Sequence, residues 1–241
     1  MINRPRLALL GTCLVAATAL AVVMIVGDRP RWRSGGVDDR PGRAALAYRD
    51  AEIPFFQWGT ELFTVPLLRG AYGEVVYITQ RSSADEGKLV EAAEDLLRRY
   101  PAVDFFFAVH GGHPLPTAFQ RIAPGLRSHL RLVYTTGCGD LRFGDAWLRA
   151  GAKAFVGHAG HLSASPMFFI YFLRRWSEGL TVAEALDAAN TQAGNRLGVL
   201  DRLGEESWGE ALRLPAGATR HTLVEETLAR GLGAMSLRVG R

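Results

Sequence analysis

The chain has 241 residues, of which 48% are hydrophobic and 22% charged, and its formal net charge is +4 at pH 7. These values are typical of one globular domain with a sizeable core. The sequence has no basic stripe with interleaved aromatic residues, which argues against nucleic-acid binding. The two cysteines, Cys13 and Cys138, form no disulfide framework, because Cys13 lies in a hydrophobic N-terminal segment.

That N-terminal segment predicts a membrane anchor. Residues 7–26 carry no charge, and they are long enough to cross a bilayer as a helix, which needs about 20 residues. A cleaved signal peptide usually has a shorter apolar region, and Thr12 is a poor residue before a lipidated cysteine. We therefore expect residues 1–27 to be an uncleaved signal anchor that contacts the membrane through residues 7–26, with a cleaved signal peptide as the alternative.

The charges beside this segment bear on its orientation. Arg4 and Arg6 favour a cytoplasmic N-terminus, whereas Arg29, Arg31 and Arg33 on the other flank weaken that preference. The expectation is a single-pass protein of the bacterial inner membrane with its domain outside the cytoplasm. Residues 28–46 are rich in Gly, Pro, Arg and Asp and predict a linker, and residues 47–241 form the expected domain.

Strand and helix patterns alternate from residue 74 onwards, whereas residues 47–73 and 200–241 show no clear period. Short apolar, β-branched or aromatic runs predict strands at 75–79, 105–109, 132–136 and 154–157. Capping boxes, proline positions and helical spacing predict helices, which lie at 83–100, 117–122, 144–150, 165–179 and 181–190. This alternation indicates an α/β fold, with a mostly parallel sheet covered by helices on both faces.

Two of the predicted strands lead into residues that could form a nucleophilic site. The strand at 105–109 is followed by His110-Gly111, and the strand at 132–136 is followed by Gly137-Cys138. Such an order can put an imidazole beside a thiol at one edge of a parallel sheet, where the histidine would favour the reactive thiolate. The competing interpretation of Cys138 is a buried structural thiol.

These two elements, FFFAVHG and LVYTTGC, resemble the caspase-like cysteine peptidase superfamily. The stretch LRAGAKAFVGHAGHLSASPMFFIYFLRRWSEGLTVAEALDAAN resembles its CHAT and gingipain-like branches, and the resemblance covers residues 74–192. It implies a caspase-like domain that cleaves a protein or peptide substrate through a thioester acyl-enzyme, with no cofactor and no metal. His110 would be the general base and Cys138 the nucleophile. The backbone N–H groups of Gly111 and Cys138 would form the oxyanion hole.

Four further residues near these strand ends are predicted to bind substrate, namely His113, Asp140, His158 and His161. His113 is also a rival to His110 as the base. Asp140 has a second interpretation, in which its carboxylate interacts favourably with a helix N-terminus.

Two other functions stay open. After Gly157 the chain has His158-Ala159-Gly160-His161, whereas the CHAT pattern usually has a Leu-Trp pair and an Asp, so the domain could be an inactive relative that only binds a partner. The two His-x-x-His pairs, which begin at His110 and His158, could instead bind zinc together with Cys138. An α/β-hydrolase is excluded, because the sequence has no G-x-S-x-G motif.

Overall fold

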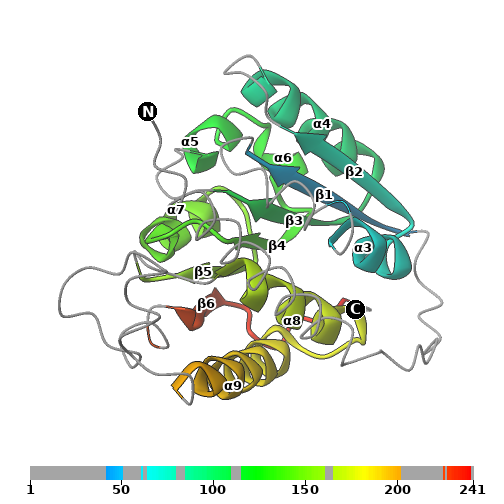
Figure 1. The fold of residues 1–241 in the computed structure, drawn as a ribbon. Helices are drawn as coiled ribbons and strands as arrows, with labels where there is room; N and C mark the ends of the chain where they lie inside the picture. The colour runs from blue at the N-terminus through cyan, green and yellow to red at the C-terminus, as the bar shows by residue number, and fades with distance from the viewer. Residues whose placement is uncertain are drawn as a thin grey trace, which may run out of the picture.

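The computed structural model describes residues 42–50, 61, 64–79, 85–109, 115–160, 165–201, 225 and 227–239. These residues build a six-stranded sheet with the strand order β2-β1-β3-β4-β5-β6 (Figure 1). β1 to β5 pair in parallel, and β6 pairs antiparallel with β5. The strands are β1 (Arg43–Arg49), β2 (Glu74–Thr79), β3 (Ala102–Ala108), β4 (Leu130–Thr135), β5 (Ala154–His158) and β6 (Ala229–Gly233).

Helices cover both faces of this sheet (Figure 1). They are α3 (Val65–Ala71), α4 (Asp85–Arg99), α5 (Leu115–Phe119), α6 (Pro124–Arg127), the 3-10 segment η3 (Asp140–Phe143), α7 (Gly144–Arg149), α8 (Ser165–Ser177) and α9 (Val182–Asp201). Because side chains alternate along a strand, Phe106 packs with α3, α8 and α9, whereas Phe105 and Phe107 pack on the other face with α4, α5 and α7. The predicted α/β class and mostly parallel sheet are confirmed.

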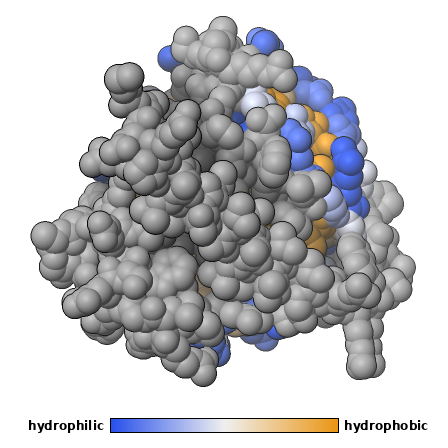
Figure 2. Space-filling model, viewed as in Figure 1, coloured by the Kyte–Doolittle hydropathy of each residue, from blue (hydrophilic) through white to orange (hydrophobic). Residues whose placement is uncertain are grey.

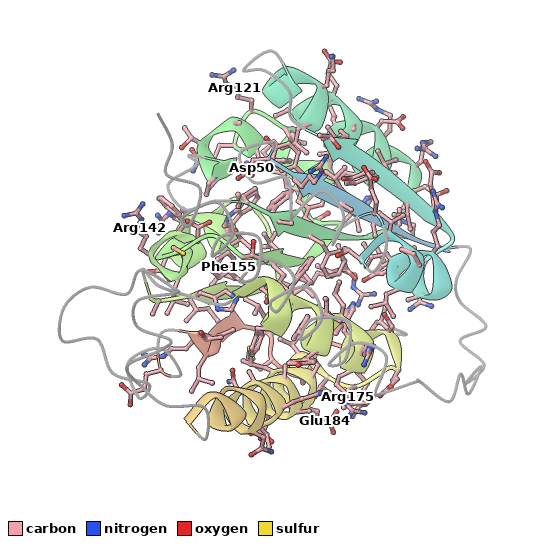
Figure 3. All side chains as sticks on the ribbon, in the orientation of Figure 1. Asp50, Arg121, Arg142, Phe155, Arg175 and Glu184 are labelled. Carbon is pink, nitrogen blue, oxygen red and sulfur yellow. The ribbon has the colours of Figure 1, made fainter. Side chains whose placement is uncertain are left out.

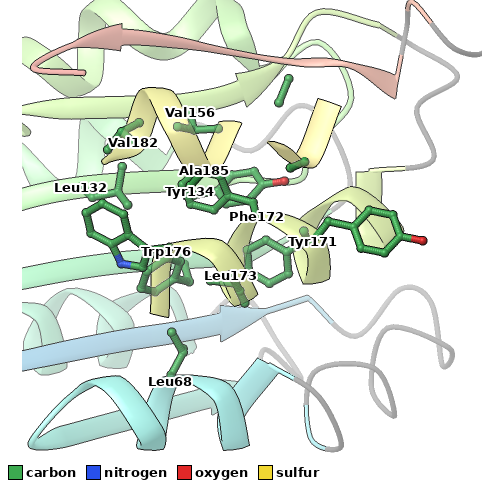
Figure 4. Packing of buried hydrophobic residues seen from close by; sticks show 14 of the residues in the cluster. Leu68, Leu132, Tyr134, Val156, Tyr171, Phe172, Leu173, Trp176, Val182 and Ala185 are labelled. Atoms are coloured by element: carbon green, nitrogen blue, oxygen red, sulfur yellow. The ribbon is translucent and has the colours of Figure 1, made fainter. Parts of the chain in front are cut away.

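Aromatic residues fill the layer between β4 and α8. Tyr134 on β4 lies edge-on to Phe172 on α8, with 5.0 Å between ring centroids, and Phe172 stacks on Trp176 (Figure 4). Such offset and edge-on arrangements stabilise aromatic pairs beyond the area they bury. The helix predicted at 165–179 is therefore confirmed as α8, and its aromatic side chains belong to the core.

Charged side chains lie around this core. Figure 3 shows Phe155 among the packed side chains, and four charged residues toward the periphery, namely Arg121, Arg142, Arg175 and Glu184. In the space-filling view, a narrow hydrophobic strip between hydrophilic residues lies on the side that carries β2 and α4 (Figure 2). β2 is an edge strand, and all of its residues are half-buried.

Four elements of the domain lie outside the segments predicted from the sequence or extend beyond them. β1 begins at Arg43, so the last residues of the predicted linker belong to the sheet. Its central residues are mostly alanine, which strands do not favour, and its burial on both faces decides its structure. α3 and β6 fall in the two segments without a clear period, and α9 continues beyond residue 190 to Asp201.

Residues 1–41, which include the predicted anchor and most of the predicted linker, lie outside the described residues. Within the part of the chain that the structure describes, no helix has the length and apolar character needed to span a membrane. The anchor at 7–26 stays a prediction.

A buried polar chain crosses the domain near the start of β3. The register between β3 and β4 shifts after Val103, and the Asp104 carboxylate accepts the Leu132 N–H at this irregularity (3.1 Å). The Tyr72 hydroxyl donates to the other Asp104 oxygen (2.6 Å), and the Trp176 indole N–H donates to Tyr72 (2.7 Å). The chain thus joins the end of α3, the sheet and α8.

Arg131 supplies the opposite charge to this carboxylate. Its Nε lies 3.6 Å from Asp104 Oδ1, and its guanidinium also donates to the backbone carbonyl of Arg238. Burial raises the pKa of Asp104, against the lowering effect of Arg131 and of the hydrogen bond from Tyr72. Burial, followed by the nearby Asp104, raises the pKa of Tyr72 well above its usual value, so its hydroxyl remains a donor.

Replacing Tyr72 with phenylalanine should destabilise the domain by about 2–4 kcal/mol, because it leaves a buried carboxylate oxygen and a buried indole N–H without their partner. Urea unfolding of the Tyr72→Phe variant measures this loss. Tyr100→Phe is the matched control, since the Tyr100 hydroxyl donates to Glu74 at a part-buried site where Arg99 also binds that carboxylate. Equal stability of the two variants would contradict the assignment.

Candidate functional site

The ends of β3 and β4 are joined beyond the regular ladder by the side chain of Thr136. Its backbone N–H donates to the Phe107 carbonyl (2.9 Å). Its hydroxyl accepts the Val109 N–H (3.0 Å) and donates to the Val109 carbonyl (3.2 Å). Val109 directly precedes His110 in the sequence, and Thr136 precedes Cys138 by two positions. Val109 and Thr136, which follow these two strands, therefore lie together at one edge of the sheet.

Cys138 is half-buried in the tight turn that leaves β4. The Asp140 N–H donates to the Gly137 carbonyl (3.1 Å) and closes the turn. Gly139, the third residue of this turn, has a positive φ of 71°, which glycine adopts without strain. The Gly139 N–H donates to the Gly160 carbonyl (2.8 Å), just past β5. The peptide units on both sides of Cys138 are thus held by hydrogen bonds.

This arrangement determines where the Cys138 N–H points. All described peptide bonds are trans, so the N–H of the Gly137–Cys138 unit lies opposite its carbonyl, which faces the Asp140 N–H. Among the described residues, no acceptor for the Cys138 N–H is found. A fixed N–H without an acceptor in the described part of the chain is the kind of donor that stabilisation of an oxyanion requires.

The Asp140 side chain lies beneath the same turn and is 3% exposed. One of its carboxylate oxygens accepts the Thr135 hydroxyl (2.8 Å), and that hydroxyl accepts the Gly137 N–H (3.2 Å). A Cβ at Gly137 would come within 2.1 Å of the Asp140 carboxylate. Gly137 is not among the positive-φ glycines, so the close carboxylate, not the backbone conformation, requires glycine here. This geometry favours a role within the turn over contact with substrate.

His158 at the end of β5 is fully buried. Its Nδ1 lies 2.9 Å from the Thr227 carbonyl, which can only accept, so Nδ1 carries the proton. Its Nε2 then accepts from the Tyr134 hydroxyl at 3.1 Å. Burial lowers the pKa of His158 to about 4, so the ring is neutral at pH 7. With both nitrogens engaged inside the protein, His158 fits a structural role better than the predicted contact with substrate.

The other predicted site residues, His110, Gly111, His113 and His161, lie outside the described residues. Their predicted roles stay predictions. Within the described ranges, no group of three or more His, Cys, Asp or Glu side chains is placed to hold a metal ion. Of the four histidines in the two His-x-x-His pairs, the structure describes one, His158, and its nitrogens have protein partners.

Sequence reasoning missed two residues of this site, Thr135 and Thr136. They stand directly before Gly137-Cys138, and threonine hydroxyls commonly bind nearby backbone groups. The signal was therefore present, but which backbone group each hydroxyl binds depends on the neighbouring strand and on the turn.

Comparison of the chain with protein-family models, with curated proteins and with solved structures found no match. The site is therefore interpreted from its own geometry.

Acidification should destabilise the protein through His158. The unfolded chain binds a proton at this position below its usual pKa of 6.5, whereas the folded protein does so only near 4, so the stability is lost as the pH falls through this window. Between pH 7 and pH 5 the wild type should lose about 2 kcal/mol more unfolding free energy than the His158→Gln variant. Urea unfolding at the two pH values measures the difference.

His129→Gln provides the matched histidine control for that experiment, because it leaves His158 in place. Its stability should fall more steeply with acidification than that of His158→Gln. Identical pH dependence in wild type and His158→Gln would show that His158 is not a buried neutral group.

Adding a methyl group at Gly137 should destabilise the protein by about 1–3 kcal/mol, because the new Cβ overlaps the Asp140 carboxylate. Thermal and urea unfolding of Gly137→Ala measure this loss. In an Asp140→Ala background the same substitution should cost less, since the overlapping group is gone. Gly87→Ala in α4 is the control, because a Cβ there meets nothing within 4 Å. An equal cost of Gly137→Ala in both backgrounds would contradict the assignment.

Proposed function

We propose that this chain is a caspase-like cysteine endopeptidase in which Cys138 is the nucleophile and His110 the general base. The observation that carries the proposal is the double hydrogen bond between the Thr136 hydroxyl and Val109. Val109 directly precedes His110, and neighbouring Cα atoms are about 3.8 Å apart. These hydrogen bonds therefore support a position for His110 at the sheet edge where Cys138 lies.

The strand order also supports a ligand site at this edge. β2 follows β1 on one side of the sheet, whereas β3 lies on the other side of β1. In open parallel sheets, ligands bind beyond the carboxyl ends of the strands where the order reverses. β1 and β3 meet at such a point, and the Asp50 N–H donates to the Ala108 carbonyl there (3.2 Å). His110 follows β3, and Cys138 follows the next strand.

The proposed chemistry uses groups of this chain alone. The Cys138 sulfur would attack the scissile carbonyl and form the tetrahedral intermediate, whose oxyanion the Cys138 N–H and the Gly111 N–H would stabilise. His110 would give its proton to the leaving amine as the C–N bond breaks, which leaves a thioester on Cys138. His110 would then take a proton from the water that hydrolyses the thioester. No cofactor is needed.

The proposed setting of this activity is a membrane. An uncharged run at 7–26 supports an anchor, and Arg4 and Arg6 support a cytoplasmic N-terminus. The domain would then act on proteins or peptides outside the cytoplasm, next to the bacterial inner membrane.

The full chain should cleave members of a peptide library, and the Cys138→Ala variant should cleave none of them. Cys138 should also react with iodoacetamide at pH 7 at least about tenfold faster in the wild type than in His110→Ala, because the histidine promotes the thiolate. Mass spectrometry after proteolysis assigns the alkylation to Cys138.

His129→Ala is the matched control for the His110 variant. The His129 carbonyl accepts the Val103 N–H at the amino-terminal end of β3, at the opposite edge of the sheet from Cys138. This variant should keep wild-type alkylation and cleavage. Equal cleavage by wild type and Cys138→Ala would defeat the proposal. No cleavage by the wild type, together with an alkylation rate that is the same in wild type and His110→Ala, would also defeat it and would favour a domain that only binds a partner.

A further inference from the structure

We propose that Asp140 is a positioning residue, which acts through Thr135 to hold the Cys138 N–H in place for the oxyanion. The inference rests on the proposed function in that it takes Cys138 as the nucleophile. Its basis is the buried hydrogen bond between the Thr135 hydroxyl and the Asp140 carboxylate, and the position of that carboxylate in the space that a Cβ at Gly137 would need.

Asp140 controls both hydrogen-bonding groups of Gly137. Its backbone N–H binds the Gly137 carbonyl directly (3.1 Å). Its carboxylate accepts the Thr135 hydroxyl (2.8 Å) and so orients it, and that hydroxyl in turn accepts the Gly137 N–H (3.2 Å). Since the Gly137 carbonyl belongs to the same rigid peptide unit as the Cys138 N–H, holding Gly137 at both ends sets the direction of that N–H.

The carboxylate has a specific part in this arrangement, because a hydroxyl has a single hydrogen. When the Thr135 hydroxyl donates that hydrogen to Asp140, its lone pairs are left to accept the Gly137 N–H. Without the carboxylate, the hydroxyl is free to rotate and donate elsewhere. A charged acceptor in a buried site also forms a stronger hydrogen bond than a neutral one.

The two adjacent threonines therefore act on different parts of the site. Thr136 joins the turn to the end of β3, which leads to His110, whereas Thr135 and Asp140 hold the turn itself. The reactivity of the Cys138 sulfur depends on the contact of Thr136 with Val109. Stabilisation of the oxyanion depends on the contact of Thr135 with Asp140. Loss of Asp140 should accordingly impair the formation of a tetrahedral intermediate more than the reactivity of the sulfur.

Two reactions of Cys138 in the full chain separate these effects. Iodoacetamide alkylates the sulfur with loss of iodide and forms no oxyanion. p-Nitrophenyl acetate acylates it through a tetrahedral oxyanion, forms the C–S bond, and releases p-nitrophenolate as the C–O bond breaks. Asp140→Ala should slow the acylation at least about tenfold, because an oxyanion donor contributes about 10²–10³ in rate, and should leave the alkylation rate within about twofold. A changed thiol pKa would move both rates together.

Substitutions at Thr135 test the path of this effect and do not depend on the folding of Asp140→Ala. Thr135→Val should reproduce the selective loss of acylation, and Thr135→Ser, which keeps the hydroxyl, should restore it. The Thr135→Val, Asp140→Ala double variant should lose no more acylation than either single variant. Asp145→Ala, at an exposed carboxylate in α7, should leave both rates unchanged.

The proposal is overturned if the two rates fall equally in Asp140→Ala or Thr135→Val, or if neither falls. Failure of the proposed function gives a different result. The peptidase assignment fails if wild type and His110→Ala are alkylated at the same rate and no peptide is cleaved. If acylation still falls selectively in Asp140→Ala and Thr135→Val, the positioning role of Asp140 stands.

Discussion

β3 and β4 lie side by side in parallel, and the Thr136 hydroxyl extends their pairing past the last backbone hydrogen bonds of the ladder. Parallel neighbours end at one edge of a sheet, so this contact determines which residues of distant sequence can meet. The buried run Phe105–Phe107 fixes β3 between two layers of helices. A one-residue slip would exchange its faces, which the packing on both sides prevents.

The tight turn at Cys138 depends on small residues for two distinct reasons. Gly139 adopts a backbone conformation that other residues reach with strain, whereas Gly137 leaves the space that the Asp140 carboxylate occupies. The turn is therefore specified by conformation on one side of the cysteine and by packing on the other. A half-buried thiol between two such residues is held in position without being covered.

Much of the sheet follows from local sequence patterns, because the predicted strands that became β2 to β5 are continuous apolar or β-branched runs. The sequence patterns did not predict β1, because its alanines and terminal arginines form a strand only when both faces are covered. β6 was not predicted either, because the segment ARGLG has no strand pattern and depends on its antiparallel pairing with β5. Tertiary contacts, which a short stretch of sequence does not reveal, determine the structure of both strands.

The candidate site divides in a similar way. Cys138 and the order of the strand ends were visible in the sequence, because an apolar run followed by Gly-Cys is a local feature. The role of Thr135 and the interior position of His158 were not, because they depend on partners at Asp140 and Thr227 that only the fold supplies. A histidine beside a strand end looks the same in sequence whether it faces a ligand or the core.

The contact of Arg131 with the Arg238 carbonyl bears on the order in which the domain can fold. Val239 is buried in the same core as Trp176, and β6 pairs with β5, so residues 229–239 contribute to both the sheet and this core. Arg238 lies 107 positions after Arg131 in the sequence, so the buried Asp104–Arg131 pair acquires this partner through a contact between distant segments. Such a contact forms late, because the entropy of closing a long loop opposes it until the segments between have packed.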